Sequence, residues 1–214
     1  MGRLSRVSQV MRHHSTSQLG EKQAASSAIW TNMSCRRIPM ATRERPSFIA
    51  HWREIERPDD QHYEGDDELM SVGAPFGKAF GLRKLGIHHE RLPPGRRTSF
   101  PHAESAEEEF VYVVEGEPDV WLDGHLHRLK AGDAVGFPAG TGIAHSFLNN
   151  TEAEVQLIVV GERSNAENRI VYPLNPDRKA LRKDWWNDHP RHTLGPHDGL
   201  PDQVRAAKAR QQGE

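Results

Sequence analysis

The feature that most constrains this 214-residue chain is a series of short strand-like runs separated by turn residues between residues 85 and 162. Apolar or alternating runs such as 109–115 and 154–160 each end at a glycine, as expected of β-strands. Asp123-Gly124 is a strong signal for a two-residue hairpin turn. No clear helical pattern intervenes, so we predict an all-β domain, an antiparallel sandwich or barrel.

One stretch, from Gly95 to Gly116, carries residue types that suit a metal site. It predicts two short strands, the first with His102 and Glu104 and the second beginning at Glu109. Because side chains alternate along a strand, the first two point to the same side, and a hairpin return would bring Glu109 near them. Imidazole and carboxylate groups that converge in this way can hold a divalent metal ion.

A second stretch, residues 132–149, completes a pair of motifs. The first motif begins with a glycine, continues with positions for histidine and glutamate, and closes with a second glycine. The second motif has a glycine, then Pro138, Gly140, His145 and Asn149. Together they span roughly residues 85–162 and resemble the paired motifs of the cupin superfamily, in its small single-domain form. The resemblance implies an antiparallel double-stranded β-helix, the jelly-roll cupin barrel, with irregular extensions at both ends.

The resemblance also implies a ligand set. His102, Glu109 and His145 fall on three metal-ligand positions, and Glu104 stands where the family usually has a second histidine. The chain departs from the pattern at Pro101, which takes the place of the first histidine. Two histidines with one or two carboxylates suit iron, manganese, zinc or nickel, and the ligand set and metal identity are what these departures leave open.

Burial supplies a physical reason for a metal. If these side chains face the interior, two carboxylates lie close together away from water, and one takes up a proton unless a cation is present. An unpaired buried charge costs on the order of 3–5 kcal/mol, which a divalent ion removes. The alternative is a barrel that has lost its metal, with Glu104 and Glu109 hydrogen-bonded to arginine, serine or water.

Three function classes follow. The resemblance allows an isomerase, decarboxylase or dioxygenase that acts on a small oxygenated substrate, sugar-like or carboxylic. Glu104 and Glu109 would then be catalytic and move a proton, and the substrate would be bound by Arg96, Ser99 and Phe147, with arginine gripping an anionic group. Alternatively, the pocket senses or stores a small molecule without turnover, or the domain is purely structural.

Other histidines are interpreted as structural. His88 and His89 are adjacent on a predicted strand and therefore face opposite ways, so they cannot easily share one ion. His125 and His127 flank the predicted hairpin tip and are expected on the surface. The histidines between residues 189 and 197 are scattered among proline and glycine, which favours a loop over a zinc site.

Composition limits the partners. The formal net charge of −2 gives no electrostatic support for nucleic-acid binding, and no apolar run is long enough to cross a membrane. The single Cys35 excludes an internal disulfide framework, and we expect a cytoplasmic protein. Phe110 and Tyr112 on an exposed sheet face predict a homodimer that covers them.

We divide the chain into four parts. Residues 1–39 are expected to be disordered or, with Arg3, Arg6 and Arg12 among apolar residues, an organelle-targeting segment. Residues 40–84 form an N-terminal arm and edge strand, with a first strand expected near 79–85. Residues 85–162 form the barrel, and 163–214 form a C-terminal arm and tail with a short helix over 204–212.

Overall fold

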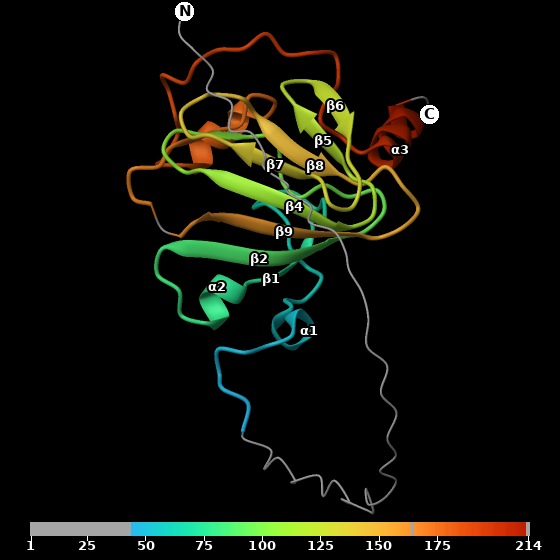
Figure 1. The fold of residues 1–214 in the computed structure, drawn as a ribbon. Coiled ribbons are helices and arrows are strands. Elements are labelled where there is room, and N and C mark those ends of the chain that lie inside the picture. Colours follow the sequence, from blue (N-terminus) through green and yellow to red (C-terminus); the bar gives the residue numbers. More distant parts are fainter. Residues whose placement is uncertain (1–43, 164, 213–214) are drawn as a thin grey trace, which may run out of the picture. The chain divides into compact units, whose positions relative to one another are not determined.

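The computed structural model describes residues 44–163 and 165–212, so the extension predicted over residues 1–39 lies outside the described residues. Strands dominate the described part (Figure 1). They are β1 (Val72–Ala74), β2 (Leu85–Leu92), β3 (Ala103–Glu104), β4 (Glu109–Glu115), β5 (Asp119–Leu122), β6 (His125–Arg128), β7 (Ala134–Phe137), β8 (His145–Leu148), β9 (Val155–Glu162) and β10 (Ile170–Val171). The helices are α1 (Trp52–Ile55), α2 (Phe76–Ala79), the 3₁₀ helix η1 (Pro176–Leu181) and α3 (Asp202–Gln212). None of the helices in these ranges has the length and apolar content to cross a bilayer.

The strands form two facing antiparallel sheets. The first has five strands in the order β1-β2-β9-β4-β7, and the second contains β6-β5-β8. Residues 95–102 continue the second sheet alongside β8, where the backbone N–H of Thr98 donates to the Phe147 carbonyl at 2.9 Å. β3 and β10 form a further antiparallel pair. Figure 1 shows β2, β9 and β4 as one layer and β5 and β8 as the other, so the predicted all-β jelly roll is confirmed.

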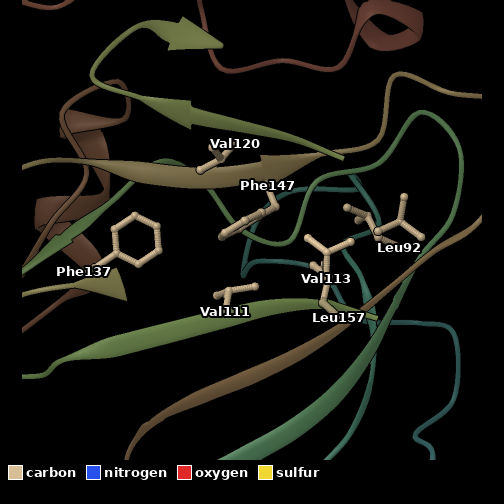
Figure 2. Close-up of a cluster of buried hydrophobic side chains, with 8 residues drawn as sticks. Leu92, Val111, Val113, Val120, Phe137, Phe147 and Leu157 are labelled. Carbon is tan, nitrogen blue, oxygen red and sulfur yellow. The ribbon is translucent and has the colours of Figure 1, made fainter. Parts of the chain in front are cut away.

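The main apolar core lies between these sheets. Figure 2 shows Val120 and Phe147 pointing from one sheet toward Val111, Val113 and Leu157 of the other. These side chains are almost completely buried, and each such burial stabilises the fold by about 1.5–3 kcal/mol. The alternation of buried and exposed residues along β4 sets which side chains enter this space.

Two local predictions were wrong. The strand expected near 79–85 is replaced by α2 and a turn at Gly81, whose φ of +69° breaks an extended run. The edge strand is instead β1, which pairs with β2. The hairpin expected between His102 and Glu109 also does not form, because β3 pairs with β10 whereas β4 pairs with β7 and β9.

The interior of the jelly roll is apolar at one end and polar at the other. Strand alternation places residues two apart on the same inward face. On three strands these inward residues change from apolar to titratable: from Leu92 to His88 on β2, from Val113 to Glu109 on β4, and from Phe147 to His145 on β8. The polar end is where the candidate site lies.

Candidate metal centre

Three predicted ligands meet at the polar end of the interior. His102, Glu109 and His145 each offer a ligand atom, and these atoms all lie within 4.8 Å of one another. The two histidines lie side by side because their backbones exchange hydrogen bonds of 3.1 and 2.9 Å. Glu109 approaches from the opposite sheet, with its Oε1 3.5 Å from Nε2 of His145. The three side chains are called the triad below.

Backbone contacts orient both imidazoles. Nδ1 of His102 lies 2.9 Å from the carbonyl oxygen of Phe100, which can only accept, so Nδ1 carries the proton and Nε2 has a lone pair. Nδ1 of His145 lies 3.5 Å from the carbonyl oxygen of Ile143. Its buried Nε2 has no hydrogen-bond partner among the described residues. An imidazole nitrogen left unpaired beside a carboxylate, with the other nitrogen held by a carbonyl, is the arrangement of a metal-binding histidine.

The charges of the triad also suit a divalent cation. Burial, together with His145, lowers the pKa of His102 to about 4, so this imidazole is neutral at pH 7. Burial alone would raise the pKa of Glu109, but the adjacent His145 and the other nearby histidines outweigh burial and lower it, so the carboxylate is ionised. Neutral imidazole and ionised carboxylate are the protonation states that bind metal. The donor set therefore fits iron, manganese, zinc or nickel.

A second set of carboxylates lies beside the triad. Burial, then the charges of Glu107 and Glu109, raise the pKa of Glu104 to about 8. Burial, then Glu109, raise the pKa of Glu107 to about 7. Asn168 binds both, with Nδ2 3.2 Å from Glu104 Oε1 and 3.4 Å from Glu107 Oε2. Crowded carboxylates of this kind favour a cation nearby, as the sequence argument anticipated.

Comparison with known proteins agrees with this geometry. The family profile described as a cupin domain matches residues 88–161. Residues 88–161 of the chain belong to the cupin superfamily.

Its relatives differ in chemistry. The polyketide synthase CurC of Streptomyces cyaneus is 33% identical over 94 residues, which cover 44% of this chain and 56% of CurC. The cupin therefore spans just over half the length of this curated relative. A candidate sugar phosphate isomerase from Acidithiobacillus ferrooxidans, solved as a crystal structure, is 27% identical with a TM-score of 0.52, over 59% of this chain and 81% of that one. A cupin-superfamily sugar phosphate isomerase structure from Silicibacter pomeroyi is 34% identical with a TM-score of 0.45, over 48% and 64%.

The other predicted site residues of the cupin lie in different places. Glu104 lines the same small cavity as Glu109 and His145 but is not one of the three convergent ligands, so its ligand role stays a prediction. The hydroxyl of Ser99 lies 3.3 Å from Nδ1 of His102 and so touches the site. Arg96 instead binds Asp59 at 2.5 Å and the Met70 carbonyl at 3.2 Å.

Phe147 does not line the site. It is 2% exposed and belongs to the apolar core, because it lies two residues further along the inward face of β8 than His145. The ring of Phe137 lies between them: it stacks on His145 with centroids 3.6 Å apart and meets Phe147 edge-on at 6.1 Å. The structure therefore brings neither Phe147 nor Arg96 to the triad.

Three contributing residues were missed from the sequence. Phe137 covers one face of His145, Tyr172 lies with its ring 5.8 Å from that of His102, and Asn168 holds the neighbouring carboxylates. Phe137 directly precedes the proline of the second motif, which is a usable signal. Asn168 and Tyr172 come from the segment after the matched domain, and no pattern in the sequence marks them.

The space beside the triad is small. The cavity that touches Glu109 and His145 measures about 10 Å³, room for about one water molecule. A larger cavity of about 390 Å³ lies along residues 171–194 and shares Tyr172 with the surroundings of the triad. Pro138, Thr141 and Ile143 of the loop before β8 line the small cavity.

The strand positions of the other paired histidines agree with the prediction. His88 and His89 face opposite sides of β2, since His88 opposes Val159 and His89 opposes Ile158. His125 and His127 are exposed on β6. Within the described ranges, the triad is the sole group of three or more histidine, cysteine, aspartate or glutamate residues with metal-ligand spacing.

Proposed function

We propose that this cupin is a metal-dependent enzyme that moves a proton next to a carbonyl group of a small oxygenated substrate. The reaction we favour is isomerisation of a sugar phosphate or a similar hydroxycarbonyl compound. The observation that carries the proposal is the triad, in which the buried Nε2 of His145 lies unpaired 3.5 Å from the Glu109 carboxylate.

The relatives support this class of chemistry. The Acidithiobacillus protein with a TM-score of 0.52 is a candidate sugar phosphate isomerase, and CurC at 33% identity is a polyketide synthase. Isomerisation of a hydroxycarbonyl begins with loss of a proton from a carbon next to a carbonyl, and polyketides react through carbons of the same kind. Proton abstraction at such a carbon is therefore a chemistry that both substrate classes share.

Each part of the site has a role in this proposal. His102, Glu109 and His145 would hold a divalent ion, which when bound would supply Lewis-acid chemistry toward a substrate oxygen. We assign proton transfer at carbon to Glu104, whose pKa of about 8 follows from burial and from the charges of Glu107 and Glu109. A group with a pKa close to the working pH is the most effective proton carrier.

Deuterium exchange tests the proposal without knowledge of the natural substrate. Protein loaded in turn with Fe²⁺, Mn²⁺, Zn²⁺ or Ni²⁺ is incubated in D₂O with a panel of aldose and ketose phosphates, and NMR follows deuterium at the carbon next to the carbonyl. We expect deuterium exchange with at least one combination of metal and sugar phosphate, and we expect the Glu104→Gln variant to lose this exchange. Exchange absent from every pair, with metal bound, would overturn the proposal.

A second candidate is a non-catalytic ligand-binding module. The cavity that touches both Glu109 and His145 favours it, because its volume of about 10 Å³ is too small for a substrate. Such a module would be stabilised thermally by a ligand of the panel but would exchange no deuterium with it.

We further propose that the protein acts as a homodimer through the outer face of β4. Phe110, Tyr112 and Val114 are 45%, 41% and 43% exposed on that face. They lie beside Ile158 and Val160 of β9, which are only half-buried. A contiguous apolar sheet face of this kind is commonly covered by a partner.

A further inference from the structure

The polar end of the interior continues beyond the triad onto β2. His88 opposes Val159 and Glu90 opposes Leu157, and both partners face the core on β9. His88 and Glu90 are therefore on the inward face, in the same sheet as Glu109 and opposite the sheet that carries His102 and His145. Neither belongs to the triad.

These two side chains form a connected pair. The hydroxyl of Ser71 donates a hydrogen bond to the Glu90 carboxylate, and Nδ1 of His88 lies 3.7 Å from Glu90 Oε1. Gly73 on β1 lies against the pair, since a Cβ there would come within 3.9 Å of Glu90 Oε1 and 4.0 Å of His88 Nδ1. The pair is thus held at the edge of the five-stranded sheet.

Packing alone does not account for a carboxylate here. The Glu90 side chain is only 16% exposed, and His88 is its sole ion-pair partner among the described residues. The next inward residue, Leu92, shows that this face of β2 accepts an apolar side chain. A buried charge without a strong partner is costly, and such groups concentrate at functional sites.

The pair shares its surroundings with the triad and with solvent. Burial, and to a smaller extent the charge of Glu109, raise the pKa of Glu90. The hydrogen bond from Ser71 and the charge of Arg57 act in the opposite direction. Burial, then Arg57, lower the pKa of His88, and Glu109 opposes them. His88 keeps 39% of its side chain exposed although its strand position faces inward, so this imidazole is in contact with solvent.

We propose that His88, held by Glu90 and Ser71, is the second proton-transfer residue of the site and acts on the oxygen atoms of the substrate. The inference rests on the proposed isomerase function. His88 accepts the proton of the substrate hydroxyl while the carbon that bears this hydroxyl becomes the new carbonyl carbon. His88 then donates the proton to the oxygen of the former carbonyl. Glu104 moves the carbon-bound proton to the adjacent carbon. The product is an isomer of the substrate, so no oxidant or reductant is consumed.

Adjacent histidines on opposite faces provide a matched test. We compare His88→Gln with His89→Gln in metal-loaded protein, using the sugar phosphate pair that shows turnover in the wild type. We expect His88→Gln to lose at least about 100-fold in kcat, the usual range for a general acid–base group, with full metal content. His89→Gln should stay within about threefold, and thermal unfolding checks that both variants fold.

Glu90→Gln gives a readout that a structural role would not change. Nδ1 of His88 lies 3.7 Å from Glu90 Oε1, so an ionised Glu90 would favour protonated His88, and its neutralisation should shift the His88 limb of the pH–rate profile to lower pH. The other charged groups that face His88, Arg57 and Glu109, are unchanged in this variant. An unshifted profile, or His88→Gln activity within about threefold of wild type, would overturn the proposal.

A measurement without turnover separates this inference from the proposed function. Imidazole NMR titrations of metal-free and Zn²⁺-loaded protein should show that the ion lowers the pKa of His88 and leaves that of His89 unchanged, because only His88 faces the triad. An unresponsive His88 overturns its placement at the site, even if the wild type is an isomerase. A responsive His88 in a protein that turns over no sugar phosphate overturns the proposed function and the catalytic role together.

Discussion

At the scale of single residues, the dominant feature of the site is the repulsion among its carboxylates. Glu104, Glu107 and Glu109 lie close together at the polar end of the interior, and the pKa values of the first two are raised to about 8 and about 7. The triad offers the neutral imidazole of His102 and the ionised carboxylate of Glu109 to a cation. Without a cation, the repulsion among these carboxylates opposes folding.

This repulsion gives the metal-free protein a definite pH dependence. The pKa of Glu104 is about 8 in the folded protein against an ordinary 4.5, so ionisation destabilises the fold progressively as pH rises from about 4.5 to 8. Glu104→Gln should raise the Tm of chelated protein, by at least about 2 °C more at pH 8 than at pH 5. Calorimetry at both pH values checks this; an equal change at the two pH values contradicts it.

Residue identity was the most predictable part of the site. His102, Glu109 and His145 were recognised because imidazole and carboxylate groups at motif positions are informative in themselves. Arg96 and Phe147 lie away from the triad. Residue type does not reveal that Asp59 binds the arginine or that the phenylalanine lies deeper in the core.

At the scale of elements, the triad depends on how strands are joined rather than on local turns. The loop before β8 is held by Asp123, whose φ of +43° lies at the tip of the β5–β6 hairpin. Its Oδ1 accepts the Ala144 N–H at 2.8 Å, and its Oδ2 lies 2.9 Å from Nδ1 of His192. One side chain therefore connects the hairpin, the start of β8 and the C-terminal segment.

Removing this connection should weaken the fold. Asp123→Ala loses both contacts, and alanine has no side-chain hydrogen bond to offset the strain of a positive φ. We therefore expect a loss of about 1–3 kcal/mol in the free energy of unfolding. Asp123→Asn tolerates the same φ and keeps an acceptor for Ala144, so it should lose less than half as much. Urea unfolding measures both; equal losses would contradict this role of the carboxylate.

The hairpin at Asp123-Gly124 was predictable because a two-residue turn is a local property. The return from His102 to Glu109 was not, because β3 pairs with β10, which lies some sixty residues later in the chain. Pairing partners so far apart are fixed by the packing of whole sheets. The ligands still converge, since the two sheets face each other across the interior.

At the scale of the whole molecule, the described residues leave part of one sheet face uncovered. Residues 157–160 of β9 are all apolar, a composition typical of strands buried on both faces. Ile158 and Val160 are nevertheless only half-buried next to the exposed Phe110 and Tyr112. The described chain places Trp52 of α1 over His89 on this side, with ring centroids 4.5 Å apart, but leaves β4 open. A second copy on β4 would bury the remainder.

Light scattering coupled to size exclusion tests the dimer. The wild-type protein should give the mass of two chains, and Tyr112→Lys should shift the population toward one chain, because a charge would be buried in the interface. Leu181→Lys, at a residue 57% exposed outside this face, serves as the control and should remain dimeric. A wild-type mass of one chain would contradict the proposal.

The central claim is that the triad binds a metal ion. Elemental analysis of untagged protein, dialysed against each candidate metal, compares the wild type with Glu109→Gln and with Glu108→Gln, whose parent residue is the exposed neighbour. We predict close to one ion per chain for the wild type and for Glu108→Gln. For Glu109→Gln we predict metal affinity at least about tenfold weaker, because loss of even a residue that only supports a ligand lowers metal affinity by that factor. Equal metal content in all three proteins would contradict the claim.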